Sequence, residues 1–217
     1  RNTQYAIHNM SPSLLSPFAA VVLAAGLSSR YGGGINKLLL PFRGVTVIRC
    51  VAQTVLRAGV GQVVVVTGHA REQVEAALGD LSLRFVYNPR YQQGEMSSSI
   101  KAGLDWLGET PARGAFIVPG DQPLLPEWIF WRLGEAFLNG CGGILAPRYG
   151  MRRGHPVLLG RVWWPAVQHL PDGTPIRVLL QAHPQAVAHI LVNTDTILLD
   201  VDTPEAYQQA LARATDL

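Results

Sequence analysis

Two cations and two carboxylates stand out as residues that could carry out chemistry. Arg30 and Lys37 lie in a glycine-rich loop, Asp121 directly follows an apolar segment, and Asp202 lies close to the end of the chain. Carboxylates can hold Mg²⁺ against phosphate oxygens, because this ion prefers oxygen ligands and needs only one or two protein carboxylates. Arginine and lysine can offset the charge of those phosphates. The two cations therefore favour a phosphorylated ligand, and the two carboxylates are candidate ligands of a metal ion that accompanies it.

The glycine-rich loop runs from Leu23 to Lys37, directly after a predicted strand at 18–23. Ligands of open α/β sheets bind beyond the carboxyl ends of strands, and small loop residues let backbone N–H groups approach phosphate oxygens. The loop has neither the G-x-G-x-x-G pattern nor the Gly-Lys-Ser/Thr ending of a P-loop. A flexible surface loop is the alternative interpretation, and the two separated cations favour phosphate binding over it.

Both aspartates also have a structural interpretation. Asp121 lies in the segment Pro-Gly-Asp-Gln-Pro at 119–123, where an aspartate is often a turn former or helix cap. Asp202 precedes Thr203 and Pro204, which together form a good helix start that Asp202 could merely serve. The Gly-His-Pro segment at 154–156 could likewise be only an irregular turn.

Short apolar runs alternate with amphipathic segments along most of the chain. The runs predict strands at 18–23, 62–67, 83–87, 115–118, 143–146, 155–159, 188–192 and 197–201. The amphipathic segments predict helices at 47–58, 72–78, 97–107, 162–169, 175–181 and 204–212. This alternation predicts parallel strands joined by right-handed crossovers. The expected fold class is α/β, as a Rossmann-like, doubly wound three-layer sandwich with a mostly parallel sheet.

The composition predicts one globular domain over residues 18–217. The chain has 217 residues, of which 48% are hydrophobic and 15% charged, and a chain of this length can form a single core. Residues 1–17 lack periodicity and the order of a signal peptide, so we interpret them as a poorly structured segment or a remnant of expression. No apolar run is long enough to predict a membrane span.

Charge and cysteine usage narrow the expected partners and compartment. The formal net charge of +3 is dispersed rather than gathered into a basic block, which favours small anionic substrates weakly and a nucleic-acid partner hardly at all. Cys50 and Cys141 lie far apart without C-x-x-C spacing. We therefore expect a protein of the reducing cytoplasm, without a zinc or disulfide framework.

The glycine-rich loop resembles a known signature. Leu-Ala-Ala-Gly-x-Ser-x-Arg at 23–30, followed by Asn-Lys-Leu-Leu-Leu-Pro at 36–41, is similar to the loop of the MobA-like nucleotidyltransferases, and most similar within them to molybdenum cofactor cytidylyltransferases. The resemblance runs from about Ala19 to Tyr207. It departs at Tyr31, where Met or Phe is usual, and at 32–34, where three glycines lengthen the loop. It implies a sheet arranged as in nucleotide-diphospho-sugar transferases.

The resemblance also implies roles for individual residues. Lys37, Arg30 and Asp121 would be catalytic, and Asp121 and Asp202 would bind Mg²⁺. Nucleotide binding is expected of Leu23, Ala24, Ala25, Gly26, Ser28, Lys37, Thr67, Gly68 and Ser97. Acceptor binding is expected of Arg153, Gly154, His155 and Pro156. For Ser97, in the helix-opening segment 94–100, a plain N-cap role is an equal alternative.

These roles imply a Mg²⁺-dependent cytidylyltransferase that joins CTP to a molybdopterin-type molybdenum cofactor and releases pyrophosphate. Ala25 stands where related guanylyltransferases have glycine, and its methyl group would narrow the pocket against a purine. Three alternatives are a GTP-using enzyme, an enzyme acting on a sugar or polyol phosphate, and a non-catalytic cofactor-binding assembly factor. An NAD-dependent oxidoreductase is disfavoured by the missing G-x-G-x-x-G. A transient contact with a molybdenum hydroxylase stays open; neither nucleic acid nor membrane is expected as a partner.

Overall fold

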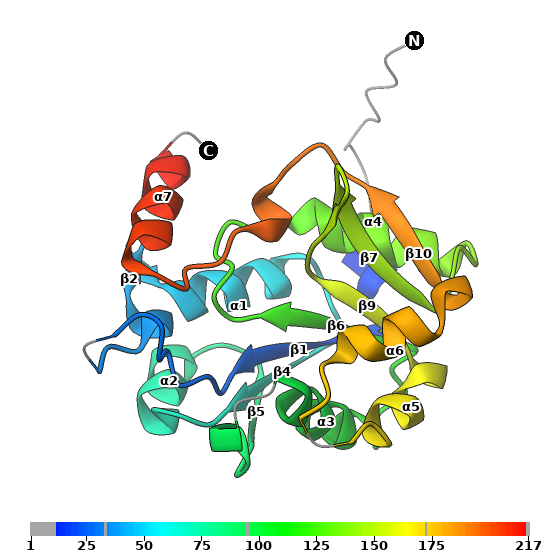
Figure 1. Ribbon diagram of the computed structural model, residues 1–217, viewed down its shortest axis with the longest axis horizontal. Helices are drawn as coiled ribbons and strands as arrows, with labels where there is room; N and C mark the ends of the chain where they lie inside the picture. The colour runs from blue at the N-terminus through cyan, green and yellow to red at the C-terminus, as the bar shows by residue number, and fades with distance from the viewer. Residues whose placement is uncertain (1–11, 33, 94–95, 172, 216–217) are drawn as a thin grey trace.

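A mixed eight-stranded sheet forms the centre of the computed structural model, which describes residues 12–32, 34–93, 96–171 and 173–215 (Figure 1). The strand order is β10-β7-β9-β6-β1-β4-β5, with β8 paired to β7. The strands are β1 Phe18–Ala24, β4 Gln62–Thr67, β5 Arg84–Tyr87, β6 Gly114–Pro119, β7 Ile144–Tyr149, β8 Arg152–Arg153, β9 Val157–Gly160 and β10 Val187–Leu191. A separate antiparallel pair joins β2 Pro41–Phe42 to β3 Val45–Thr46.

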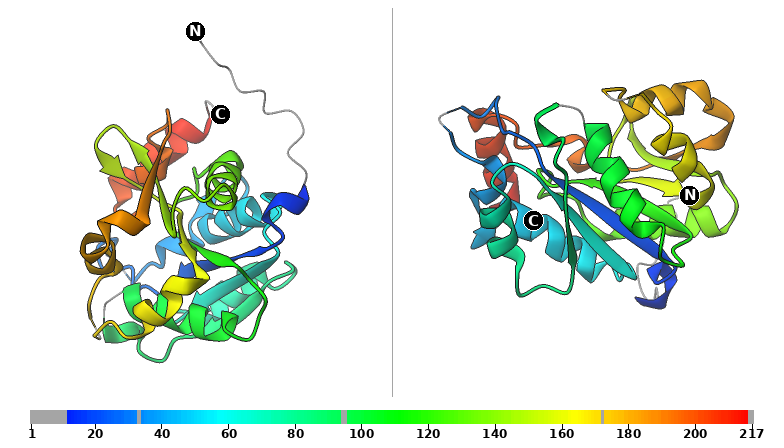
Figure 2. Two further views of the ribbon diagram at one scale, coloured as in Figure 1. Left: turned by 90° about the vertical axis from the view of Figure 1, so that its right-hand side faces the viewer. Right: turned by 90° about the horizontal axis from the view of Figure 1, so that it is seen from below.

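Helices cover both faces of this sheet (Figure 2). They are α1 Val47–Arg57, α2 Arg71–Leu78, α3 Met96–Leu107, α4 Glu127–Leu138, α5 Trp164–Gln168, α6 Ile176–Ala182 and α7 Pro204–Thr215. Successive side chains of a strand point to opposite faces. Accordingly, Ala20 and Val22 of β1 pack with residues of α1, α2 and α4, whereas Ala19 and Val21 pack with residues of α3, α5 and α6. The predicted three-layer α/β sandwich is confirmed.

Strand β1 is the point at which the strand order changes direction. It pairs in parallel with β4 on one side and with β6 on the other. The chain first builds the sheet outwards through β4 and β5, then crosses to β6. The carboxyl ends of β1 and β6 therefore form a topological switch point, where open α/β sheets bind their ligands.

Capping side chains explain where helices α1 and α7 begin. The hydroxyl of Thr46 accepts a hydrogen bond from the N–H of Arg49 at 3.3 Å at the start of α1. The hydroxyl of Thr203 accepts from the N–H of Ala206 at 3.2 Å at the start of α7. Threonine caps satisfy N–H groups that have no partner within the helix. Because Thr203 caps α7, Asp202 is available for another role.

The predicted strand at 197–201 is wrong. Residues Thr196–Leu198 form the 3₁₀ helix η6, and the following segment crosses the end of β6. There the N–H of Val201 donates to the carbonyl of Asp121 at 3.0 Å, outside any strand ladder. Apolar residues alone did not distinguish a buried strand from a buried crossing segment.

Helix α4 was not among the predicted elements, although its pattern is readable. Ile129, Phe130 and Leu133 are buried at helical spacing after Pro126. The remaining predicted strands and helices are present, with boundaries displaced by at most three residues. Strand β9, for example, begins at Val157, because its pairing with β6 starts opposite Ile117.

The packed core extends upstream of the first strand. Leu15, at the end of the 3₁₀ helix η1 Pro12–Leu15, is only 1% exposed and belongs to the core that includes α4. Residues 1–11, part of the segment expected to be poorly structured, lie outside the described residues. Among the described residues, no helix is both long and apolar enough to span a bilayer.

Gly103 lets α3 lie close against the sheet, which gives a first testable prediction. A Cβ atom there would lie 2.4 Å from Cγ1 of Val21 and 3.1 Å from Cγ2 of Val66. Gly103→Ala should lower the free energy of unfolding by about 1–3 kcal/mol, the usual cost of overpacking a core. The matched control is Gly79→Ala, whose nearest contact is an ordinary 3.4 Å. Urea denaturation checks both; equal stabilities for the two variants would contradict the prediction.

Candidate functional site

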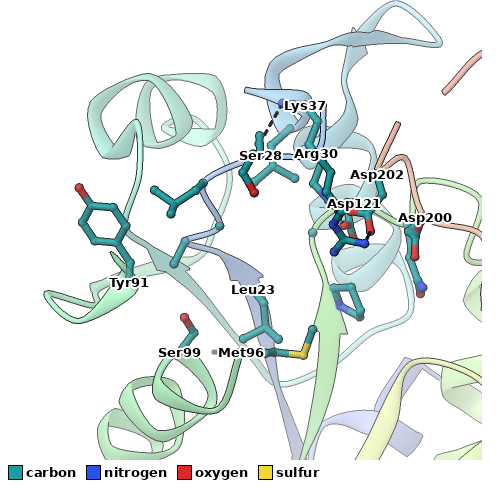
Figure 3. A pocket seen from close by; sticks show the side chains of 18 of the residues that line it. Leu23, Ser28, Arg30, Lys37, Tyr91, Met96, Ser99, Asp121, Asp200 and Asp202 are labelled. Atoms are coloured by element: carbon teal, nitrogen blue, oxygen red, sulfur yellow. Dashed lines mark hydrogen bonds and ion pairs between the residues drawn. The ribbon is translucent and has the colours of Figure 1, made fainter. Parts of the chain in front are cut away.

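A cleft of about 400 Å³ opens at the switch point, beyond the carboxyl ends of β1 and β6. Its walls come from the loop after β1, the segment after β6, the start of α3 and the segment before α7. Figure 3 shows Arg30, Asp121 and Asp202 gathered on one side, Tyr91 across the cleft, and Met96 and Ser99 at the start of α3. Segments far apart in the sequence thus meet in one hollow.

Ser28 fixes the position of Lys37. Ser28 adopts a left-handed conformation with φ of 55°, which turns the loop so that its hydroxyl accepts the N–H of Lys37 at 3.2 Å. The side chain of Asn36 caps the 3₁₀ helix η2 Lys37–Leu39 by accepting from the N–H of Leu38 at 3.0 Å. Lys37 is therefore the first residue of a capped turn directed at the cleft, although glycines separate it from Arg30.

Asp121 and Asp202 are brought together by a backbone contact between their segments. Asp121 follows β6, and its carbonyl accepts the hydrogen bond from Val201, the neighbour of Asp202. Val201 is buried together with Tyr207 and Ala210 of α7 and Val47 of α1. Packing of the last helix therefore holds Asp202 against the end of a central strand.

The four charged residues predicted to act on phosphate form one connected group, which we call the charge cluster: Arg30, Lys37, Asp121 and Asp202. Lys37 Nζ contacts Oδ2 of Asp121 and Oδ1 of Asp202. Arg30 Nη1 lies 2.6 Å from Oδ2 of Asp202. The Lys37 side chain is only 12% exposed. Burial alone would lower the pKa of Lys37, but the charges and hydrogen bonds of the two aspartates outweigh it and raise the pKa.

The two carboxylates of the charge cluster fit a divalent ion that is shared with a phosphorylated ligand. A single ammonium nitrogen reaches both of them, so a single metal ion could do the same. The described residues contain no group of three or more His, Cys, Asp or Glu side chains suited to hold a metal. Mg²⁺ commonly binds through one or two carboxylates plus substrate phosphates, and this donor set has that form.

Ala25, Gly68 and Tyr91 form a close-packed unit on the opposite side of the cleft. A Cβ atom at Gly68 would lie 2.6 Å from Cβ of Tyr91 and 2.8 Å from Cβ of Ala25. Gly68 is therefore required to be glycine for Tyr91 and Ala25 to hold their places. Both of these residues line the cleft, so the unit sets the width of the hollow at this side.

Asn88 connects this unit to the start of α3. Its side-chain amide donates to the hydroxyls of Ser98 at 2.9 Å and Ser99 at 3.0 Å. Its side-chain oxygen accepts from the N–H of Arg90 at 3.0 Å, next to Tyr91. Asn88 is 1% exposed, so these bonds are made away from solvent, where an unsatisfied group is costly. One buried amide thus fixes the segment next to Tyr91 relative to the start of α3, and both segments line the cleft.

His155 and Asp200 also line the cleft, close to the carboxylates of the charge cluster. Burial lowers the pKa of His155, although the charge of Asp121 opposes this, so the ring is expected to be neutral near pH 7. Its Nδ1 atom is buried without a hydrogen-bond partner. Asp200 keeps exposure to solvent, but partial burial, followed by the like charges of Asp202 and Asp121, raises its pKa.

The structure brings most of the predicted site residues into the cleft. Those that line it are Leu23, Ala25, Gly26, Ser28, Arg30, Lys37, Asp121, His155 and Asp202. A Cβ at Gly26 would meet no atom within 4 Å, so the backbone there faces open space. That openness suits the approach of a phosphate to backbone N–H groups.

Seven predicted residues lie outside the cleft lining: Ala24, Thr67, Gly68, Ser97, Arg153, Gly154 and Pro156.

Burial accounts for most of these seven positions. Ala24 is fully buried, and the buried hydroxyl of Thr67 donates to Glu75 at 3.1 Å. Ser97 is buried inside α3 rather than at its N-cap, while Gly94 and Glu95 lie outside the described residues. Arg153 is exposed on β8, two residues from His155.

Ten of the residues that line the cleft were not among the predicted site residues. Tyr91, Met96 and Gln122 all contact the cleft. Gln122 adjoins the recognised Asp121, and its Oε1 is buried without a partner, so its place in the motif was a usable signal. Tyr91 lies in a short 3₁₀ helix after β5, and only the folded contact with Gly68 and Ala25 reveals its role.

The sequence is similar to those of known proteins. Residues 20–187 match the family described as the MobA-like NTP transferase domain. The chain is 28% identical to the molybdenum cofactor cytidylyltransferase of Escherichia coli K12, over 94% of this chain and 100% of that protein. It is 33% identical to the nicotine blue oxidoreductase of Paenarthrobacter nicotinovorans, over 88% of this chain and 95% of that protein.

Comparison by structure gives the same fold. The crystal structure of Rv0371c from Mycobacterium tuberculosis H37Rv has a TM-score of 0.80 at 27% identity, over 90% of this chain and 97% of that one. A manganese complex of the same protein has a TM-score of 0.75 at 26% identity, over 90% of this chain and 98% of that one. That relative has therefore been crystallised with a divalent ion.

The raised pKa of Asp200 leads to a prediction about stability and pH. A carboxyl group whose folded-state pKa is raised destabilises the fold when ionised, at pH above its ordinary pKa of about 3.9. Asp200→Asn removes a charge that faces Asp202 and Asp121. We expect its melting temperature to exceed that of the wild type at pH 7, with the difference shrinking as the pH falls towards 4.

The control for this measurement is Asp105→Asn on the exposed face of α3, which removes the same charge away from the charge cluster. Thermal denaturation by circular dichroism at several pH values compares the variants. If Asp200→Asn lowers the melting temperature at pH 7, favourable contacts of Asp200 outweigh the repulsion.

Proposed function

Because the chain belongs to the MobA-like NTP transferase family and is thus a nucleotidyltransferase, we propose that it is a Mg²⁺-dependent cytidylyltransferase that joins CTP to a molybdopterin-type molybdenum cofactor. The family resemblance seen in the loop at 23–41 is confirmed by the family match. The observation that carries the proposal is the meeting of Lys37, Asp121 and Asp202 at the end of β6.

The nucleotide would bind in the cleft between the charge cluster and the Ala25–Gly68–Tyr91 unit. Lys37, Arg30 and the backbone N–H groups near Gly26 and Ser28 would receive the triphosphate, since cations and free N–H groups are complementary to its charge. The base would lie towards Ala25 and Tyr91, where the cleft is walled by packed side chains. Thr67, Gly68 and Ser97 would support that wall from behind.

Asp121 and Asp202 would hold Mg²⁺, which supplies electrostatic stabilisation of the charge that develops on the phosphates. An oxygen of the acceptor phosphate forms a bond to the α-phosphorus of CTP, the bond from that phosphorus to the β-phosphate oxygen breaks, and pyrophosphate leaves. Lys37 and Arg30 would stabilise the departing pyrophosphate. Phosphate acceptors are ionised at neutral pH, so the neutral His155 is not needed as a base. Positioning and electrostatics account for the catalysis.

The acceptor would approach from the side of His155. This residue lines the cleft beside Asp121, and the hairpin that precedes it carries the exposed Arg153. Gly154 is pressed against Ile197, because a Cβ there would lie 2.4 Å from the carbonyl oxygen of that residue. The segment from Arg153 to Pro156 is thereby held in a fixed path, which supports its assignment to the pterin substrate.

The proposal also covers the domain organisation, the cellular compartment and the partner of the protein. Residues 18–217 would act as a single nucleotidyltransferase domain in the cytoplasm. Delivery of the product would involve a transient contact with a molybdenum hydroxylase. The 28% identity to the molybdenum cofactor cytidylyltransferase of Escherichia coli K12 supports the choice of substrates.

An oxidoreductase is the second candidate function. It is favoured by the 33% identity to nicotine blue oxidoreductase over 88% of the chain. The absence of G-x-G-x-x-G and the paired carboxylates beside Lys37 favour nucleotidyl transfer instead. Oxidation of NADH or NADPH in the presence of a quinonoid dye, without Mg²⁺ dependence, would identify the second function.

The decisive assay is pyrophosphate release with Mg²⁺ and molybdenum-loaded molybdopterin, with CTP, GTP and ATP compared in parallel. We expect release that requires the acceptor and occurs with CTP. Asp121→Asn should lower kcat at least about 100-fold, the scale of losing electrostatic stabilisation in a transition state. Its melting temperature should stay within a few degrees of that of the wild type. Near-normal turnover in Asp121→Asn would overturn the assignment. Tight cofactor binding without release by any nucleotide would indicate an assembly factor.

The proposed base selection has its own test in Ala25→Gly. Removing the methyl group opens the wall shared with Tyr91. We expect the ratio of kcat/KM for CTP over GTP to fall by about 10-fold, the value of one methyl group in a close-fitting pocket. The control is Ala70→Gly, at a left-handed position outside the cleft lining. An unchanged ratio would indicate that residues other than Ala25 select the base.

A further inference from the structure

Lys37 lies between the two carboxylates to which the proposed function assigns a metal ion. Its ammonium group contacts Oδ2 of Asp121 and Oδ1 of Asp202. Both aspartate side chains are largely enclosed, with exposures of 18% and 16%. A metal ion that bridges Asp121 and Asp202 would need the space that this ammonium group takes. Two cations cannot occupy it together.

Arg30 also pairs with one of these carboxylates, that of Asp202, from the solvent side. Its guanidinium contacts the second carboxylate oxygen of Asp202 at 2.6 Å, but its side chain is 76% exposed. Hence both cations assigned to the phosphates are paired with the carboxylates assigned to the metal. The pairing satisfies charges that would otherwise be enclosed without a partner, which is strongly unfavourable.

We propose that Lys37 is an exchangeable counter-ion of the Asp121–Asp202 pair, which yields its place to a divalent ion when a polyphosphate offers the ammonium group a new anionic partner. The identity of the polyphosphate rests on the proposed function. The exchange itself needs only a divalent cation and a diphosphate or triphosphate group. No bond is made or broken in it.

The exchange predicts that Lys37 has opposite effects on two binding reactions. For a metal ion alone, Lys37 is a competitor, since its displacement leaves an enclosed ammonium group without an anion. For the metal with a polyphosphate, Lys37 is a partner of the phosphates. A lysine that served only the phosphates would leave the affinity for the metal alone unchanged. The sign of the effect therefore separates the two roles.

The first experiment titrates Mn²⁺ into the wild type and Lys37→Gln, with free Mn²⁺ followed by electron paramagnetic resonance. Without any nucleotide, we expect Lys37→Gln to bind Mn²⁺ about 5- to 150-fold more tightly, the usual range of coupling between sites. In the presence of pyrophosphate, the order should reverse, with the wild type binding Mn²⁺ more tightly. Equal or weaker binding of Mn²⁺ alone by Lys37→Gln would overturn the proposal.

Two further variants make this result specific. Arg57→Gln removes a cation that is also paired with a carboxylate, Glu127, at the end of α1. It should leave Mn²⁺ affinity unchanged within about twofold, because exposed charges far from the ion are screened. Asp121→Asn in the Lys37→Gln background should abolish the tight binding. If Mn²⁺ still binds there, the metal site of the proposed function is wrong, whatever the role of Lys37.

A second measurement uses the wild-type chain and so does not depend on the folding of a variant. The chain has two lysines, Lys37 and Lys101, and Lys101 donates to the carbonyl of Leu170 away from the charge cluster. In protein labelled with ¹³C at lysine Cε, Mg²⁺ with pyrophosphate should shift the Lys37 signal and leave the Lys101 signal in place. A Lys37 signal that is the same before and after this addition would overturn the proposal.

Discussion

The hydrogen bond from the N–H of Val201 to the carbonyl of Asp121 is the contact on which the site depends. It joins the end of a central strand to a segment 80 residues later, directly before the last helix. The strand order places the loop after β1 beside the same point. Together with the burial of Val201 against α7, this bond fixes Asp202 relative to Asp121 and so keeps both carboxylates in the charge cluster. Assembly of the cleft therefore requires the complete fold, including α7.

The charge cluster shows how enclosed charges can be stable in a site built for highly charged ligands. Lys37 satisfies Asp121 and Asp202 at once, while the more exposed Arg30 contacts only Asp202. Asp200 is a further carboxylate nearby, and partial burial, followed by the like charges of Asp202 and Asp121, raises its pKa. An excess of negative charge on this side favours a divalent cation, and that cation in turn favours phosphates. Charge balance thus supports the two ligands of the proposed function.

Much of this arrangement could be predicted from the sequence, because it depends on local signals. The valine run at 62–67 and the glycine-rich loop placed the central strands and their carboxyl ends. Thr203 and Pro204 marked the start of α7. The strand predicted at 197–201 was wrong, because its apolar residues are buried by crossing the end of β6 and not by pairing. The contacts of Tyr91 were also beyond prediction, since no periodic pattern records which loop packs on which.

The Ala25–Gly68–Tyr91 unit shows why pocket shape is a property of several residues together. Tyr91 and Ala25 can both lie this close to Gly68 only because Gly68 has no side chain, as a Cβ there would approach both within 2.8 Å. The position of Tyr91 is also held by the bonds of Asn88 to Arg90 and to Ser98 and Ser99. A change at Ala25 would therefore act on the pocket in two ways, by removing its own methyl group and by freeing Tyr91 to move. Sequence differences at this one position can alter the shape of the pocket more than the volume of a methyl group suggests, because close-packed neighbours respond together.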